Sequence, residues 1–584
     1  MNFCKRVFVL WTVVLVSMLV ARFQASQAHA NVLPIITGNE RFHPVYAQSG
    51  MVASQEAQAS EIGLSILRQG GNAVDAAVAT GFALAVTLPR AGNLGGGGFM
   101  LVHLAEAGET IAIDYRETAP MAATRGMYLG ADGKADPDLS RNSGLGTGVP
   151  GTVAGLALAH EKYGSGSFSL AELIAPAIRL AEQGIVVSDD LSMSLERARE
   201  RLGRYESTRA IFYGAADGVP QPGDRLVQRD LGNTLRGIAR NGPAAFYSGE
   251  IAERIAASVR AAGGVMTADD LAGYEPKLRE PVRGTYRGHE IVSMSPPSSG
   301  GIHIIQILKM LEGFDLAGSG AGSARHYHLM AEAMRRAYAD RAVYLGDPDH
   351  VEVPVAALLD EGYLADRAAD IDPEHATPSA DVSAGTLPKY ESEQTTHFSV
   401  VDRFGNAVAN TYTLNFSYGL GLVAEGTGVL LNNELDDFAA APGVPNAYGL
   451  VGGEANAPAP GKRPLSSMSP TFVFKDGKLE LATGTPGGSR IISMVTQIII
   501  DMVDFGMNPA EAVAAPRMHH QWLPDVLRVE QGVSPDTVRL LEVMGHKVEQ
   551  GRASGSVQSI MITPEGLLAG ASDPRRPGAG TVGY

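Results

Sequence analysis

Two adjacent threonines, Thr395 and Thr396, begin a strand-like run directly after a polar segment. The preceding residues 379–394 are rich in Ser, Glu, Asp and Gly, which is typical of a mobile surface loop. A break after Gln394 would give Thr395 a free α-amine with a reference pKa of about 7.7 to 8.0. An amine of this pKa can exchange protons near neutral pH, whereas an amide nitrogen is not a useful base. The junction therefore looks like a hidden N-terminus, and the freed threonine could be a nucleophile with its own base.

A hairpin after the junction places a second threonine near the first. Residues 402–406 fit a three-residue turn with its glycine in the left-handed region. Counting outward from this turn pairs His397 with Thr411 and Thr395 with Thr413. Directly opposite residues of an antiparallel pair have Cβ atoms about 4.5 to 5.5 Å apart. The register thus predicts that the two threonines are neighbours.

Alternation along this hairpin predicts one polar face and one apolar face. The polar face comprises Thr395, His397, Ser399, Thr411, Thr413 and Asn415. Alternation alone is typical of the solvated side of a sheet, since threonine is common in strands. A catalytic face is the alternative.

The elements that must position this hairpin form a mixed pattern. Helical periodicity occurs at residues 57–67, 73–87, 170–183, 231–241, 324–344 and 509–515. Strand-like runs occur at residues 99–104, 111–115, 290–294, 397–401, 407–414, 471–474 and 557–562. The second of these helices is apolar nearly all round, which predicts that it is buried. The mixture favours layered sheets covered by helices.

The first thirty residues predict a secretory signal peptide. Lys5 and Arg6 precede an apolar run, and the segment ends in the small-x-small pattern of residues 28–30. A membrane anchor is the weaker interpretation, because the run is shorter than the roughly 20 residues of a spanning helix. The only cysteine, Cys4, lies within this segment, so the mature chain would have no disulfide and no cysteine nucleophile.

Charge disfavours nucleic acid as a partner. The chain carries a formal net charge of −16, and loss of residues 1–30 removes three basic and no acidic residues, giving −19. Beyond the signal, no segment suggests a membrane span.

Several motifs together resemble the γ-glutamyltranspeptidase family, and the resemblance runs almost end to end. They lie at residues 92–98, 114–117, 395–402, 405–406, 411–415, 431–438, 463–470 and 486–490. The resemblance implies an α+β fold, the four-layer αββα sandwich of the N-terminal nucleophile hydrolases. It also implies self-cleavage between Gln394 and Thr395, with residues 31–394 as the large subunit and residues 395–584 as the small catalytic subunit of a heterodimer. Export to the periplasm or the medium is the expected location.

The resemblance also implies roles for single residues. Thr395 would be the nucleophile, Thr413 would orient its hydroxyl, and the amides of Gly487 and Gly488 would stabilise the oxyanion. The α-carboxylate of a γ-glutamyl group would be bound by Arg116, Ser466 and Ser467, and its α-ammonium by Asn415, Glu434 and Asp437. Family members differ between Glu and Gln at position 434, so Glu434 is expected to tune affinity and pH response.

A lid is a further expectation from the resemblance. Residues 442–460 are rich in Gly, Pro and Asn and include Tyr448. They resemble a loop that covers the pocket in some members, whereas a flexible surface loop is the alternative. A covered pocket favours small γ-glutamyl substrates such as glutathione, with amino acids or dipeptides as acceptors.

Other motifs carry less weight. Residues 146–151 match a dinucleotide fingerprint, but no clear strand precedes them and Pro150 sits awkwardly at the helix entrance. The four glycines at 95–98 are expected to serve close backbone packing. Histidines at 326, 328, 519 and 520 lack nearby carboxylates at helical spacing, so no metal and no cofactor are expected.

Two other functions remain open at this stage. A β-lactam side-chain (glutaryl) acylase of the same superfamily would act on a group that lacks the α-ammonium, and Glu434 and Asp437 disfavour that interpretation. A non-catalytic exported amino-acid-binding protein would keep its chain intact.

Overall fold

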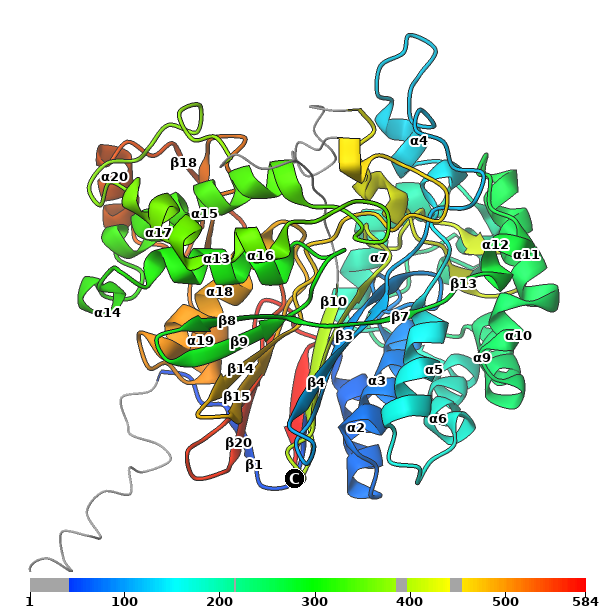
Figure 1. The fold of residues 1–584 in the computed structure, drawn as a ribbon. Coiled ribbons are helices and arrows are strands. Elements are labelled where there is room, and N and C mark those ends of the chain that lie inside the picture. The colour runs from blue at the N-terminus through cyan, green and yellow to red at the C-terminus, as the bar shows by residue number, and fades with distance from the viewer. Residues whose placement is uncertain (1–40, 215–216, 385–395, 442–453) are drawn as a thin grey trace, which may run out of the picture. The chain divides into compact units, whose positions relative to one another are not determined.

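The computed structural model describes residues 41–214, 217–384, 396–441 and 454–584, and residues 44–584 are built around two seven-stranded sheets (Figure 1). The hairpin sheet has the order β21 (Gly580–Gly583), β2 (Met51–Ser54), β10 (Thr396–Val401), β11 (Ala407–Thr413), β3 (Gly97–Leu104), β4 (Glu109–Tyr115) and β7 (Lys277–Arg279). The second sheet has the order β1 (Val45–Ala47), β20 (Leu568–Ser572), β19 (Gln558–Ile562), β15 (Lys478–Thr483), β14 (Thr471–Lys475), β9 (His289–Ser293) and β8 (Val282–Tyr286).

Helices cover the outer face of each sheet. Against the hairpin sheet pack α2 (Ala57–Arg68), α3 (Ala73–Thr87) and α5 (Thr152–Tyr163), with α6 (Leu170–Gln183) and α9 (Arg229–Asn241) behind them. The second sheet is covered by α13 (Gly300–Leu311) and α19 (Pro509–Ala514), with α18 (Arg490–Val503), α15 (Ala324–Tyr344), α17 (Glu361–Ala369) and α20 (Pro535–Val543) packed beside and behind α13 and α19. Strand β10 contacts β15 and β19 across the interface between the sheets. The predicted αββα sandwich is thereby confirmed.

The remaining elements are short connections and small sheets, apart from two longer helices, α7 and α11. They are α4 (Pro137–Arg141), η1 (Gly144–Gly146), β5 (Ile185–Val186), α7 (Asp189–Leu202), α8 (Glu206–Phe212), β6 (Arg225–Leu226), α10 (Ala244–Tyr247), α11 (Gly249–Ala261), α12 (Ala268–Ala272), α14 (Leu316–Ser319), α16 (Val355–Leu358), β12 (Val423–Ala424), β13 (Val429–Leu430), η2 (Glu434–Asp437), η3 (Glu454–Asn456), β16 (Met518–His519), β17 (Leu527–Glu530) and β18 (Val548–Gly551).

Helix α3 has the bounds predicted from sequence and is buried over its full length. Asn72 and Asp75 form a capping box, which satisfies two backbone N–H groups at its start. The N–H of Ala73 donates to a carboxylate oxygen of Asp402 at 2.9 Å. The turn of the hairpin is therefore held by the first turn of the central helix.

The hairpin register is confirmed for its described residues. His397 pairs with Thr411, and Thr396 pairs with Tyr412. Solvation of the polar face, however, is wrong: His397, Ser399 and Thr411 are fully buried between the two sheets. The ring nitrogens of His397 lie 2.8 Å from the Thr411 hydroxyl and 3.0 Å from that of Ser399, so the polar groups satisfy one another.

Two glycine-rich segments pack closely against strands, as expected for residues 95–98. A Cβ on Gly96 would lie 1.8 Å from the carbonyl oxygen of Thr413. The amides of Gly151 and Thr152, at the start of α5, donate to the Gly96 carbonyl at 2.8 and 3.0 Å. The first amides of this helix are thus used within the protein.

The segment before the junction begins with residues that are attached to the rest of the protein. Ser379 and Val382 are buried, and the indole N–H of Trp522 is shared between their carbonyl oxygens at 3.0 and 2.8 Å. Asp525 accepts from the Ser379 amide at 2.8 Å. Ala380, Asp381 and Ser383 are exposed, as expected for a surface loop, while Ser379 and Val382 attach it to the protein, and residues 385–394 lie outside the described part of the chain.

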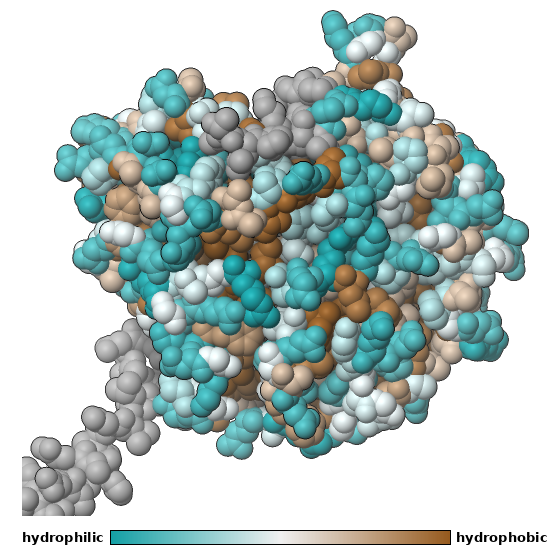
Figure 2. Space-filling model, in the orientation of Figure 1, coloured by the Kyte–Doolittle hydropathy of each residue, from teal (hydrophilic) through white to brown (hydrophobic). Residues whose placement is uncertain are grey.

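The face drawn in Figure 2 is mainly hydrophilic at its edges, and hydrophobic residues show toward the middle. Among the helices that the structure describes, none has the length and hydropathy needed to cross a bilayer.

Candidate active site

The end of β11 positions one predicted site residue on the hairpin. Thr413 is 1% exposed, and its hydroxyl oxygen accepts a hydrogen bond from the amide of Asn415 at 2.8 Å. The hydroxyl hydrogen has no acceptor among the described residues and remains available to a neighbour. Asn415 has φ +70°, a left-handed conformation that asparagine tolerates, and this ends the strand. Gln394 and Thr395 lie outside the described residues.

Gly487 and Gly488 lie just before α18 with φ angles of +146° and +66°. Side chains rarely adopt these values, and a Cβ on Gly487 would lie 2.3 Å from Met494 Cε. The backbone amides of both glycines donate no hydrogen bond within the described part of the chain. The loop therefore offers free donors at the start of a long helix, where an anion is favoured.

This glycine loop is supported from behind. The Tyr338 hydroxyl donates to the carbonyl oxygen of Ser489, and the Ser489 hydroxyl donates to Gln521 at 2.7 Å. His519 contacts the same Gln521 oxygen at 2.8 Å. These contacts fix the position of the two free amides.

Arg116, directly after β4, is fully buried among three carboxylates. Its guanidinium forms ion pairs with Glu434 and, at 2.5 Å, with Asp437, and lies 3.7 Å from Glu117. Its Nε donates to the carbonyl oxygen of Pro464 at 3.1 Å. The sequence-predicted carboxylate and ammonium ligands are therefore brought together.

The charges of this cluster do not balance, because one guanidinium faces three acids. Burial raises the pKa of Glu434 well above its usual range, and it raises that of Glu117 to about 8. Burial opposes the charge on Arg116, but Glu434 and Asp437 outweigh it and raise its pKa. Both carboxylate oxygens of Glu117 and Oε2 of Glu434 are buried and accept no hydrogen bond from the described residues. The cluster has spare acceptor capacity for a cation.

Asn415 connects the hairpin to this cluster. Its side-chain amide donates to the carbonyl oxygen of Asn433 at 2.9 Å, and Asn433 immediately precedes η2, which carries Glu434 and Asp437. Asn432 accepts from the Glu434 amide at 3.0 Å. The hairpin end and the acidic turn are thus joined directly by a hydrogen bond.

Ser466 and Ser467 are fully buried beside a second arginine that sequence reasoning missed. Arg341 donates to Ser467 Oγ at 2.7 Å and to Ser299 Oγ at 2.8 Å. The Ser466 carbonyl oxygen accepts from the Ser299 amide at 2.7 Å. A buried cation therefore lies behind the serine pair.

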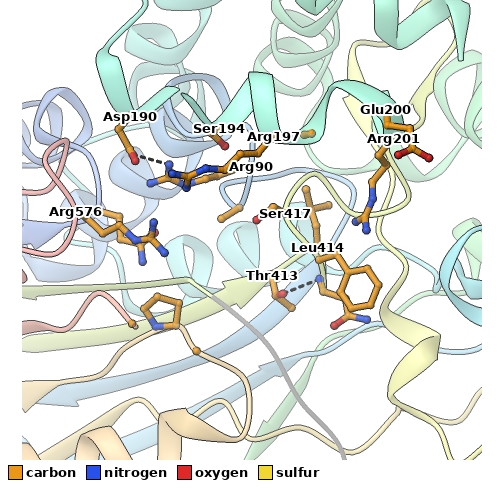
Figure 3. A pocket seen from close by; sticks show the side chains of 18 of the residues that line it. Arg90, Asp190, Ser194, Arg197, Glu200, Arg201, Thr413, Leu414, Ser417 and Arg576 are labelled. Carbon is orange, nitrogen blue, oxygen red and sulfur yellow. Dashed lines mark hydrogen bonds and ion pairs between the residues drawn. The ribbon is translucent and has the colours of Figure 1, made fainter. Parts of the chain in front are cut away.

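A cavity of about 670 Å³ adjoins Thr413, Asn415 and Gly487, so the hairpin end and the glycine loop open on the same space (Figure 3). Arg116, Glu434, Asp437 and the two serines do not line it. The predicted residues thus fall into two adjoining groups.

Only the base of the predicted lid can be described, because Tyr448 and residues 442–453 lie outside the described part. Glu454 forms a two-point ion pair with Arg125, both contacts at 2.7 Å. The side chain of Asn456 donates to the carbonyl oxygen of Asp437 at 2.7 Å and accepts from the Leu465 amide at 3.0 Å. The end of this segment is joined directly to the acidic turn.

Sequence reasoning missed Glu117 and Arg341, although each had a partial signal. Glu117 lies within a motif recognised at residues 114–117. Arg341 lies on a predicted helix, where an arginine is usually solvated, and only its burial shows otherwise.

The molecule has a four-layer αββα fold, and the threonine-rich end of its β10–β11 hairpin lies beside a glycine loop. This combination is the architecture of the N-terminal nucleophile hydrolases. The chain belongs to the γ-glutamyltranspeptidase family, since the family model described as Gamma-glutamyltranspeptidase matches residues 59–583. It is 55% identical to the glutathione hydrolase proenzyme of Escherichia coli over 555 residues, 94% of this chain and 95% of that protein.

Solved structures agree with this assignment. A cephalosporin acylase from Bacillus halodurans superposes with a TM-score of 0.82 at 29% identity, covering 93% of this chain and 97% of that one. A γ-glutamyltranspeptidase chain from Helicobacter pylori is 48% identical with a TM-score of 0.55, covering 56% of this chain and 94% of that one.

Proposed function

We propose that the protein is a self-processing γ-glutamyltranspeptidase and glutathione hydrolase. The observation that carries this proposal is the buried cluster around Arg116, in which one cation and three carboxylates offer both a donor and spare acceptors. A γ-glutamyl group presents an α-carboxylate and an α-ammonium on one carbon, so it complements both kinds of ligand. Relatives named glutathione hydrolase proenzymes support this assignment.

Processing would precede catalysis. The Thr395 hydroxyl attacks the carbonyl carbon of Gln394, the amide becomes an ester, and water hydrolyses that ester. The products are a carboxylate on Gln394 and an α-amine on Thr395, which separate residues 31–394 from residues 395–584 within one heterodimer. The observed register, extended by one pair beyond Thr396, supports Thr413 as the partner of Thr395.

The mature site would then transfer a γ-glutamyl group. Arg116, Ser466 and Ser467 bind the α-carboxylate, and Glu434, Asp437 and Asn415 bind the α-ammonium. The α-amine of Thr395 accepts the hydroxyl proton as Thr395 Oγ attacks the γ-carbonyl. The amides of Gly487 and Gly488 stabilise the oxyanion, and the same proton returns to the leaving amine. Water or an amino acid then releases the ester.

Two further assignments rest on the sequence. Residues 1–30 would direct export to the periplasm or the medium, and Tyr448 would cover the bound substrate as part of a lid.

The most direct test compares wild type with Thr395→Ala on a denaturing gel with N-terminal sequencing. Wild type should give two bands, and the smaller should begin at Thr395. The variant should remain one band. An intact wild type, or a variant still cut after Gln394, would contradict the mechanism.

A glutaryl acylase is the second candidate, because structural relatives include a cephalosporin acylase. Glutaryl lacks the α-ammonium and would leave three buried carboxylates facing one guanidinium. Wild type should therefore release anilide from γ-glutamyl substrate faster than from its glutaryl analogue. Faster glutaryl release would reverse the assignment.

A further inference from the structure

The cavity beside Thr413 has a lining that the roles above leave unused. Among the described residues, five arginines line it, namely Arg90, Arg197, Arg201, Arg204 and Arg576, against two carboxylates, Asp190 and Glu200. Figure 3 shows Arg90, Arg197 and Arg576 gathered on one side of the cavity, with Thr413 across from them. An excess of three positive charges is notable in a chain of net charge −16, and such a cleft attracts anions.

The topology sets this arginine group opposite the Arg116 cluster. Thr396, Tyr412 and Tyr115 lie at the same end of their strands. Thr396 pairs with Tyr412, and Gly98 of β3 pairs with both Tyr412 and Tyr115. Ser54, the last residue of β2, and Gly580, the first residue of β21, lie toward the same end of the sheet. In the strand order, β4 lies on one side of the hairpin, while β2 and β21 lie on the other.

Each flank therefore contributes its own charges at that edge. Arg116 follows β4, whereas Arg576 lies just before β21. A substrate whose acyl part occupies the Arg116 side extends its other part toward the arginines.

The arginines are only partly neutralised by the protein. Arg90 is 9% exposed and pairs with Asp190 at 2.5 Å, yet its Nη2 has no acceptor among the described residues. The side chain of Arg576 forms no ion pair or hydrogen bond with them either. Burial lowers the pKa of Arg576, and the charge of Arg90 lowers it further. An anion bound between these groups would remove that repulsion.

We propose that this cavity is the subsite for the peptide released from the γ-glutamyl group, with Arg90, Arg197 and Arg576 binding its C-terminal carboxylate. The inference rests on the proposed function. It adds the class of group that is bound beyond the γ-glutamyl part of the substrate, namely a short peptide with a free carboxylate. A dipeptide attached to the γ-glutamyl group carries one negative charge, at its free C-terminal carboxylate. Two extended residues span at most about 7 Å, and a cavity of this size holds such a group. A peptide acceptor would enter the same subsite, because its amine attacks the Thr395 ester along the reverse path.

The test compares glutathione with its C-terminal amide, which differs by one charge and keeps the shape. Wild type should show a kcat/KM about tenfold higher for the carboxylate, the effect of one charge-assisted hydrogen bond. The double variant Arg197→Gln/Arg576→Gln should bring this ratio close to one. Arg199→Gln is the matched control, because Arg199 lies on the same helix α7 but contacts Asp217 and does not line the cavity.

The outcomes separate this inference from the proposed function. A wild-type ratio near one, or an equal loss of the ratio in Arg199→Gln, overturns the subsite while γ-glutamyl release stands. Absence of γ-glutamyl release from every substrate overturns the proposed function and the subsite together. If the double variant is not processed, competition between cysteinylglycine and its amide for wild type decides, and equal inhibition overturns the subsite.

Discussion

The two flanks of the hairpin hold opposite charge arrangements. On the β4 side, one buried arginine faces three carboxylates, and on the β2 and β21 side, five arginines face two carboxylates around an open cavity. The first cluster is dehydrated and shares its charges internally, so its geometry is set before a ligand arrives. The second stays in contact with solvent, so its charges are screened and its effect is graded. The difference indicates a strict site for the acyl group and a permissive one for the group it leaves.

Removal of Arg116 should give the largest effect. Arg116→Gln leaves Glu434 and Asp437 buried without a cation, which should lower the free energy of unfolding by about 3–5 kcal/mol. Hydrolysis of a γ-glutamyl anilide should fall to background. Urea unfolding and initial rates measure both effects.

Arg199→Gln provides the control for this variant, since the loss of one exposed pair should change stability by less than about 0.5 kcal/mol. Adding Glu434→Gln to Arg116→Gln should restore part of the stability. Equal stability of Arg116→Gln and wild type would show that the charges of this buried cluster do not depend on one another.

Acid should destabilise the buried interface between the two sheets, where His397 lies. Burial lowers the pKa of His397 to about 3 from an ordinary value near 6.5. The unfolded chain therefore binds a proton at this residue that the folded chain does not, and stability falls as pH drops below about 6.5. The slope is up to about 1.4 kcal/mol per pH unit for this proton.

Urea midpoints between pH 7.5 and 4.5 measure this dependence, and His397→Gln should reduce the slope. His375→Gln is the control, because His375 is exposed. An unchanged slope in His397→Gln would place the acid sensitivity elsewhere.

Glu434→Gln should change how the strict flank responds to pH. In wild type the raised pKa values keep a proton on the empty cluster near neutral pH, and an α-ammonium binds better once that proton leaves. KM for a γ-glutamyl anilide should therefore fall, roughly threefold to tenfold, between pH 6.5 and 8.5. The variant removes the carboxyl of Glu434, whose pKa burial raises well above its usual range, so one of the two titrating groups is lost and the profile flattens.

Glu206→Gln, which changes an exposed carboxylate on α8, should keep the wild-type profile. A variant profile parallel to that of wild type would mean that Glu434 does not govern protonation of the pocket.

The sequence predicted the helices and the hairpin register better than it predicted which side chains are buried. Strong periodicity placed residues 73–87, 170–183 and 324–344 at their observed bounds, and turn geometry set the register of β10 and β11. Helices α7, α11, α13 and α18 were not predicted, nor were the short strands β2, β8 and β20, whose few residues give little pattern. Alternation could not show whether a polar face meets water or a second sheet, and His397 illustrates that ambiguity.

The candidate site shows the same division. Resemblance supplied Arg116, Glu434 and Asp437, and the structure adds that they contact one another. The arginine group could not be predicted, because Arg90, Arg197 and Arg576 come from three separate segments and resemble ordinary surface residues. The folded chain brings them together, because the loop after α3, helix α7 and the segment before β21 border the same cavity.

Salt should give the smallest effect and the sharpest contrast between the flanks. Raising ionic strength from 0.1 to 1 M shortens the screening length from about 10 to about 3 Å, so the arginines around the open cavity lose part of their attraction. The preference of wild type for glutathione over its C-terminal amide should then decrease by roughly threefold. KM for a γ-glutamyl anilide, whose leaving group is neutral, should change little because the Arg116 cluster is inaccessible to ions. Equal salt dependence of both quantities would mean that the two flanks do not differ in exposure as the structure indicates.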